Sequence, residues 1–255
     1  MMQCIVYDGS FEGLLTAVFE IYEYKISDPF ICMQGNALGS LFGSAHTITT
    51  DKIKAVRVYK KLQEKLTLNS QRQVYKTFLS EVKDIENLLY RYMRYAIDNK
   101  QSIENNYAHP DVLQLQQLSR KVDREKHRME AFVRFQLTKD ELYYAIIQPD
   151  YNVLPLIQRH FKDRYADQRW MIYDVKRKYG LYYDKKTVTE VQMNFETDLS
   201  NQAEKETIYD ENELLYQHLW QQYFGNVNIK ARKNMKLHIQ HMPKRYWKFL
   251  VEKQK

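Results

Sequence analysis

The sequence predicts a mixed α+β protein, and three observations lead to that prediction. Glycine and proline are scarce, with 7 and 5 in 255 residues, which favours long continuous elements and helices in particular. Apolar residues recur at helical spacing through most of the first 130 residues and then alternate over residues 132–137. The first 22 residues combine a short apolar run, a glycine turn and a helical pattern, which is typical of an N-terminal βα unit.

The βα unit begins with a strand over residues 3–7. Asp8, Gly9 and Ser10 then interrupt the apolar pattern, and either Asp8 or Ser10 can cap the helix that follows. Glycine turns between a strand and a helix also occur in phosphate-binding sites, but a single glycine favours the plain capping role. Residues 29–48 hold three of the seven glycines and are expected to form a loop or a short helix.

Three long helices are predicted, over residues 51–66, 70–98 and 111–129. In the first, Ile53, Val56 and Leu62 are expected to face inward while a row of lysines faces solvent. The second is an uninterrupted helical run. The third follows Pro110, a residue that suits the first turn of a helix.

After residue 130 the pattern predicts an antiparallel sheet of about five strands. Apolar and polar residues alternate in the first of them, and turn residues such as Asp184 separate the later ones. The predicted strands cover residues 132–137, 142–148, 170–175, 180–183 and 187–195. A helix over residues 152–165 crosses the sheet between the second and third strands.

The last 60 residues separate into an acidic and a basic part. Residues 196–213 hold seven acidic residues and one lysine, and a helix is expected at about residues 210–224. Residues 228–255 hold nine Lys or Arg and one acidic residue, whereas the net charge of the whole chain is only +7. We therefore expect one α+β domain over residues 1–255, helix-rich over 1–130, sheet-containing over 131–195, and ending in an acidic linker and a basic helical tail over 196–255.

A basic terminus with aromatic residues among its charges suits a polyanion, of which nucleic acid is the commonest. Lys244, Arg245 and Lys248 fall within one stripe of a helix and are the predicted phosphate contacts. The alternative is a docked terminal helix whose lysines are solvated or are neutralised by the acidic segment. Trp247 and Leu250 are expected on the docked face.

Arg124, Arg128 and Arg134 form a second predicted phosphate-binding patch. The first two share a helix face, and Arg134 extends from the strand that follows. The alternative is local ion pairing with Asp123, Glu125 and neighbouring residues, which the spacing slightly favours.

A catalytic role would fall to four polar residues, Asp8, Ser10, His160 and Asp174. A structural ion pair of Asp174 with Arg134 or Arg177 is the favoured alternative, because a carboxylate on an apolar strand needs a partner. The chain contains no P-loop, dinucleotide-binding, HExxH, CxxC or GxSxG motif. Two cysteines make neither a disulfide framework nor a zinc site, so no metal and no cofactor are expected.

Five segments together resemble a known bacterial family. They read YDGSFEGLL at residues 7–15, HRMEAFVRF at 127–135, NVLPLI at 152–157, RWMIYD with YG at 169–174 and 179–180, and HMPKRYW at 241–247. The family is a domain of unknown function labelled "probable DNA metabolism protein". Its members are typically encoded beside a radical-SAM protein described as a DNA modification or repair enzyme, and some are fused to a uracil-DNA-glycosylase-like domain.

The resemblance implies a DNA-repair context and a radical-SAM partner, and it transfers no catalytic residue. The leading hypothesis is an accessory protein of bacterial DNA metabolism that binds nucleic acid, DNA in particular. The alternatives are an enzyme acting on a nucleotide or damaged base, and a protein-interaction adaptor without affinity for nucleic acid. No signal peptide and no membrane-spanning stretch is recognised, so a cytoplasmic protein is expected.

Overall fold

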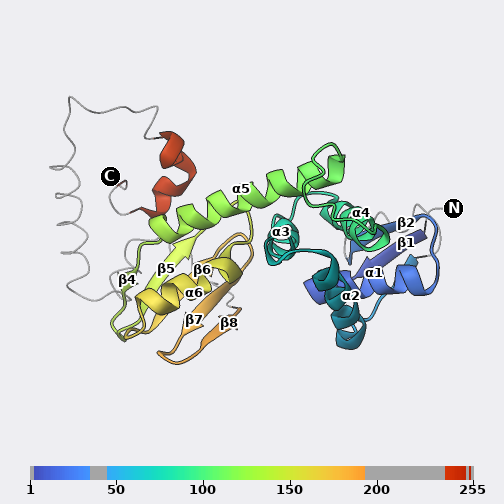
Figure 1. Ribbon diagram of the computed structural model, residues 1–255. Helices are drawn as coiled ribbons and strands as arrows, with labels where there is room; N and C mark the ends of the chain where they lie inside the picture. The colour runs from blue at the N-terminus through green and yellow to red at the C-terminus, as the bar shows by residue number, and fades with distance from the viewer. Residues whose placement is uncertain (1–2, 35–44, 193–238, 251–252, 254–255) are drawn as a thin grey trace. The chain divides into compact units, whose positions relative to one another are not determined.

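The computed structural model describes residues 3–34, 45–192, 239–250 and 253 (Figure 1). The predicted mixed α+β class and the N-terminal βα unit are confirmed. Contacts divide the chain into two compact units, residues 1–123 and 124–255. The boundary falls within helix α5 (Pro110–Phe132), close to the predicted transition at residue 130. The organisation as one domain stays a prediction.

The first unit contains a parallel three-stranded sheet of order β2-β1-β3. Its strands are β1 (Gln3–Tyr7), β2 (Pro29–Met33) and β3 (Ala45–Thr47). The prediction of a loop or short helix over residues 29–48 is therefore wrong where β2 and β3 form. Residues 35–44, between these strands, lie outside the described residues. The apolar run that follows Pro29 pairs with β1, and a proline is tolerated there because it opens an edge strand.

Besides the start of α5, the first unit contains four described helices, of which the first and the fourth pack against the sheet. They are α1 (Phe11–Glu23), α2 (Lys52–Lys65), α3 (Leu68–Phe78) and α4 (Ile85–Asp98). The single helix predicted over residues 70–98 is interrupted, because Glu81 and Asp84 adopt positive φ angles of 51° and 67°. That left-handed backbone cannot continue a right-handed helix.

The burial predicted for α2 is right for Leu62 and wrong for Ile53 and Val56. Ala55, Val58 and Leu62 are buried in the core, whereas Ile53 and Val56 are 75% and 50% exposed. Both sets of residues have helical spacing. The buried set lies at i, i+3 and i+7 and belongs to the same hydrophobic core as the buried residues of α1.

The second unit contains a five-stranded sheet of order β4-β5-β6-β7-β8. Its strands are β4 (Gln136–Leu137), β5 (Tyr143–Ile147), β6 (Trp170–Asp174), β7 (Tyr179–Tyr183) and β8 (Val188–Val191). The number of strands is as predicted, but β5 and β6 are parallel, so the sheet is mixed rather than antiparallel. Helix α6 (Leu154–Arg164) joins them, and such a crossover brings the second strand back in the same direction.

Helix α6 lies across one face of this sheet (Figure 1) and buries Leu154, Ile157 and Phe161. The terminal segment forms a 3₁₀ helix, η3 (Lys244–Phe249), that packs against β5. Pro243 is its N-cap rather than its first helical residue. Tyr246 and Leu250 are buried. The acidic segment, the helix predicted at about 210–224 and the end of the last predicted strand lie outside the described residues.

Candidate nucleic-acid interface

The parallel pair β5 and β6 places two polar chain segments at the same edge of the second sheet. Residues 148–152 leave the carboxyl end of β5, and Lys176 and Arg177 follow the carboxyl end of β6. Ligands of sheets with parallel strands commonly bind at this edge. Arg177 donates to the carbonyl oxygens of Pro149 and Asp150, at 3.2 and 3.1 Å, so the two segments are in direct contact.

Asp174 ends β6 and is fully buried. Its Oδ2 accepts a hydrogen bond from Arg177 Nη1 at 2.8 Å, and its Oδ1 accepts from the backbone N–H of Lys176 at 2.9 Å. Of the two partners considered from the sequence, Arg177 is the one that pairs. The carboxylate therefore holds the turn after β6 and stabilises the guanidinium of Arg177 beside residues 149–150.

Glu125 is the residue that joins the predicted patches, and it is buried within α5. Its Oε2 lies 3.1 Å from Arg245 Nη2 and 3.5 Å from Arg128 Nη1. Its Oε1 accepts hydrogen bonds from the Tyr246 hydroxyl and, at 2.8 Å, from the backbone N–H of Asp150. A buried carboxylate is costly unless it is paired and hydrogen-bonded, and these four donors meet that requirement.

Local ion pairing, which the sequence favoured for Arg128, is thus present, but Glu125 also binds the terminal 3₁₀ helix. Glu125 was not predicted as a site residue. It occupies the same face of α5 as the buried residues Val122 and Met129, and an acidic residue in an apolar stripe is the signal that could have identified it.

Arg245 remains accessible although it is paired. Its side chain is 41% exposed, and its Nη2 lies 2.8 Å from Oδ2 of Asp150, whose side chain is 50% exposed. Burial disfavours the charged form of the guanidinium and so acts to lower the pKa of Arg245. Contacts with Tyr246, Glu125 and Asp150 outweigh this effect and raise that pKa. The guanidinium also lies over the Tyr246 ring, 4.5 Å from its centroid.

Several other cations reach the same edge. Lys248 donates to the side chain of Gln148, and Lys176 donates to the Asp150 carbonyl oxygen at 3.0 Å. Arg124 acts electrostatically on Tyr151, as Arg245 does. We name this surface the cationic rim. It consists of Arg124, Arg128, Lys176, Arg177, Lys244, Arg245 and Lys248.

Among the described residues, the cationic rim holds more cations than carboxylates. Its seven cations face three carboxylates in the contacts described above, those of Glu125, Asp150 and Asp174. Lys244, Arg245 and Lys248 are exposed, as is Arg124. Five of the six predicted phosphate contacts therefore belong to one surface.

Arg134 is the sixth, and the structure places its guanidinium elsewhere. Its Nη1 donates to the carbonyl oxygens of Ala131 and Val133, at 2.7 and 3.3 Å, so it satisfies carbonyls at the end of α5.

His160, a predicted catalytic candidate, lies on α6. Its ring is edge-on to that of Phe161, with 5.1 Å between the two ring centroids. In the described part of the chain, no hydrogen bond or ion pair joins His160 to Asp174.

Asp8 and Ser10 lie in the first unit and form a helix cap. Ser10 accepts from the Gly13 N–H at 2.9 Å, and Asp8 accepts from the hydroxyls of Ser10 and Thr50, each at 2.7 Å. Burial alone would raise the pKa of Asp8, but these hydrogen bonds outweigh it and hold that pKa below its ordinary value. A Cβ at Gly13 would lie 2.2 Å from Asp8 Oδ1, so any larger residue would displace the Asp8 carboxylate from the cap.

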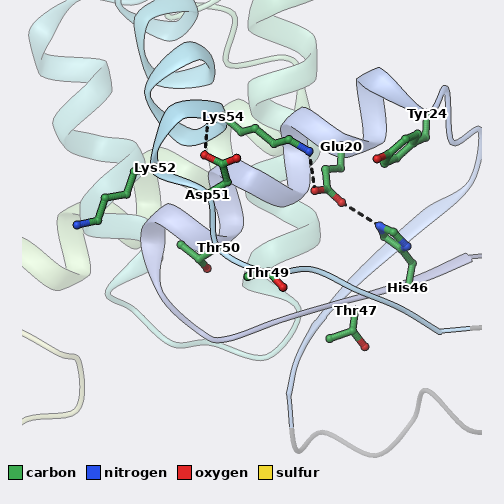
Figure 2. A pocket seen from close by; sticks show the side chains of 9 residues that line it. All are labelled: Glu20, Tyr24, His46, Thr47, Thr49, Thr50, Asp51, Lys52 and Lys54. Atoms are coloured by element: carbon green, nitrogen blue, oxygen red, sulfur yellow. Dashed lines mark hydrogen bonds and ion pairs between the residues drawn. The ribbon is translucent and has the colours of Figure 1, made fainter.

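A pocket of about 550 Å³ opens beside this cap, between α1, β3 and the start of α2 (Figure 2). Its central group is Glu20, which pairs with His46 Nε2 at 2.8 Å and with Lys54 Nζ at 2.9 Å. Burial opposes ionisation of Glu20, yet these two partners outweigh it and lower the pKa of its carboxyl. The sequence did not indicate this pocket, because His46 lies in the segment expected to be a loop or short helix.

Within the described residues, no group of three His, Cys, Asp or Glu side chains could hold a metal ion. In the same residues, no helix combines the length and the apolar character needed to cross a membrane.

The fold and the cationic rim define a mixed α+β protein with a positively charged surface at the carboxyl ends of two parallel strands. The chain belongs to the family described as domain of unknown function DUF4130, whose model matches residues 83–252. That match includes every residue of the cationic rim. No curated protein matches the chain.

Among solved structures, the chain is similar to a pGpG-specific phosphodiesterase, PggH, from Vibrio cholerae. The two share 10% sequence identity over 71% of this chain and 80% of that one, with a TM-score of 0.36. A likeness of that size does not establish a common fold.

Proposed function

We propose that this protein binds nucleic acid, DNA in the first place, through the cationic rim, and acts as an accessory protein of bacterial DNA metabolism or repair. The observation that supports the proposal is the gathering of seven cations from α5, the β6–β7 turn and η3 at one sheet edge. Phosphates of a nucleic-acid backbone are the anions that such a surface suits best.

The biological context rests on the resemblance of the five segments quoted above. It supports a role in DNA repair beside a radical-SAM enzyme. In that arrangement the cationic rim would hold the nucleic acid by its backbone, which positions a protein without reading sequence, and the partner would supply the chemistry. Co-elution of the two purified proteins in size-exclusion chromatography tests the partnership separately from DNA binding.

The alternative of an enzyme built on Asp8, Ser10, His160 and Asp174 receives less support. Hydrogen bonds occupy the carboxylates of Asp8 and Asp174 in structural roles. Asp8 and Ser10 belong to the first compact unit, and His160 and Asp174 belong to the second.

DNA binding is tested by fluorescence anisotropy with single- and double-stranded oligonucleotides at several salt concentrations. The test variant carries Lys244→Gln, Arg245→Gln and Lys248→Gln. Its matched control carries Lys139→Gln, Lys185→Gln and Lys186→Gln, which remove three exposed charges of the same unit outside the rim.

For duplex DNA, the slope of log K against log salt should flatten by about 0.9 for each phosphate that the protein no longer neutralises. We expect the slope to fall in magnitude by about 2 to 3 in the test variant and to change little in the control. Equal slopes in the two variants would contradict the assignment of the cationic rim as the DNA-binding surface. Absence of binding by the intact protein at low salt would favour the protein-interaction adaptor.

A further inference from the structure

Two carboxylates contact the same guanidinium nitrogen of Arg245, and they differ in accessibility. Glu125 Oε2 lies 3.1 Å from Arg245 Nη2, with a side chain only 2% exposed. Asp150 Oδ2 lies 2.8 Å from the same atom, with a side chain 50% exposed. A phosphate arriving from solvent could replace the second carboxylate but not the first.

The backbone of Asp150 is held in place by hydrogen bonds to its N–H and to its carbonyl oxygen. Its N–H donates to Glu125 Oε1 at 2.8 Å. Its carbonyl oxygen accepts from Lys176 Nζ at 3.0 Å and from Arg177 Nη2 at 3.1 Å. The side chain alone can move away from Arg245 while these contacts persist.

A carboxylate on an arginine resembles the phosphate that a nucleic acid would present. Both are anions whose oxygens accept hydrogen bonds from guanidinium N–H groups. An exposed ion pair is weak because water competes for both partners, so a better anion can displace it. Asp150 is therefore placed as a competitor at the surface where phosphate would bind.

We propose that Asp150 sets the affinity of the Arg245 subsite for a backbone phosphate of nucleic acid. In the free protein the carboxylate of Asp150 pairs with Arg245, and on binding a phosphate group takes its place. The inference rests on the proposed function and adds to it the residue that opposes binding. It predicts that removing this acid strengthens the interaction through Arg245 specifically.

The experiment compares Asp150→Asn with Asp163→Asn in the anisotropy assay. Asp163 is a matched control because it is also an exposed aspartate of the second unit paired with an arginine, Arg159, at 3.4 Å. Asp150→Asn should tighten binding about fivefold, the scale of an exposed ion pair. Asp163→Asn should change it by less than about twofold, because screening weakens distant charges.

A double-mutant cycle with Arg245→Gln shows whether the gain acts through Arg245. Asp150→Asn should tighten binding in the wild-type background and leave it unchanged in Arg245→Gln. The salt slope should change little in the single Asp150→Asn variant, because the same phosphate contact forms in both proteins and only the competing carboxylate is removed. Asp150→Ser repeats the measurement if the asparagine variant does not fold, as judged by circular dichroism and thermal melting.

The outcomes separate the two proposals. Equal gains from Asp150→Asn and Asp163→Asn, or a gain that persists in Arg245→Gln, would overturn the role of Asp150 while leaving DNA binding intact. If the wild-type protein and Asp150→Asn both fail to bind at low salt, the proposed function fails and this inference falls with it. Binding by Asp150→Asn alone would support the competition.

Discussion

Glu125 and Arg245 are 120 residues apart in the chain, yet the carboxylate of one lies 3.1 Å from the guanidinium of the other. The contact joins α5 to the terminal 3₁₀ helix. It also explains how a terminal segment of 3₁₀ helix, too short to be stable by itself, acquires a fixed position. Tyr246 strengthens the attachment, because its hydroxyl donates to the same carboxylate.

Replacing Glu125 should therefore destabilise the protein markedly. Glu125→Gln removes the buried carboxylate that holds Arg245 and Tyr246, and losing hydrogen bonds to such a charged group costs about 1.5–3 kcal/mol. Urea denaturation followed by circular dichroism measures the change. Glu130→Gln on the same helix is the control, since its partner Lys126 is an ordinary i,i+4 pair at 3.1 Å, expected to contribute under about 1 kcal/mol. Similar losses of stability in the two variants would contradict the central role of Glu125.

The sequence predicted the cations of this surface better than it predicted their anchor. Clustered charge identified Lys244, Arg245 and Lys248 because basic residues that are close in the chain leave a local signal. The pairing of Glu125 with Arg245 leaves no such signal, because it joins segments far apart in the chain. Only the position of Glu125 on the apolar face of α5 pointed to it.

The fold, too, was predictable where the signal is local in the sequence and not where it depends on contacts between distant segments. The helix between β5 and β6 was predicted, and a crossover of that kind already implies parallel strands, so the mixed sheet could have been inferred. The orientation of α2 could not. Its two apolar sets, one with Ile53 and Val56 and one with Ala55 and Val58, have equally good helical spacing. Packing against α1 decides between them.

Stability measurements on α2 test that orientation. Ile53 is 75% exposed and Leu62 is 2% exposed. Ile53→Ala should change the free energy of unfolding by less than about 0.5 kcal/mol, whereas Leu62→Ala should cost about 2–5 kcal/mol. Urea denaturation of both variants gives the comparison. A large destabilisation by Ile53→Ala would mean that the predicted phase of α2 was right and the observed one wrong.

Two glutamates of the first unit, Glu86 and Glu104, should contribute to the pH dependence of stability with opposite signs. Burial raises the pKa of Glu86, although Tyr7 donates to its Oε1 at 3.1 Å. Burial also opposes ionisation of Glu104, but hydrogen bonds from Ser70 and Thr67 outweigh it and lower that pKa. A raised carboxyl pKa means that the folded state is penalised once the pH exceeds the pKa of the unfolded chain, and a lowered pKa means that it is stabilised there.

Glu86→Gln should therefore raise the melting temperature at about pH 7, because glutamine keeps an acceptor for Tyr7 without the buried charge. Glu104→Gln should lower it. Both differences should shrink as the pH falls through the range in which the carboxyls become protonated. Thermal melts between about pH 3 and pH 8, which span the ordinary pKa range of carboxyl groups, test the signs. Shifts of the same sign in both variants at neutral pH would contradict the assignment.

Cys4 and Cys32 should be unreactive in the native protein. Their sulfur atoms lie 3.0 Å apart between adjacent strands, and both residues are buried. Burial raises the pKa of the Cys32 thiol to about 12, so little reactive thiolate exists near neutral pH. Labelling with a thiol-specific reagent at about pH 8 should modify neither residue before unfolding and both afterwards. A cysteine introduced at the exposed position Lys186 shows that the reagent is active, and rapid native labelling of Cys4 or Cys32 would contradict the buried placement of β1 and β2.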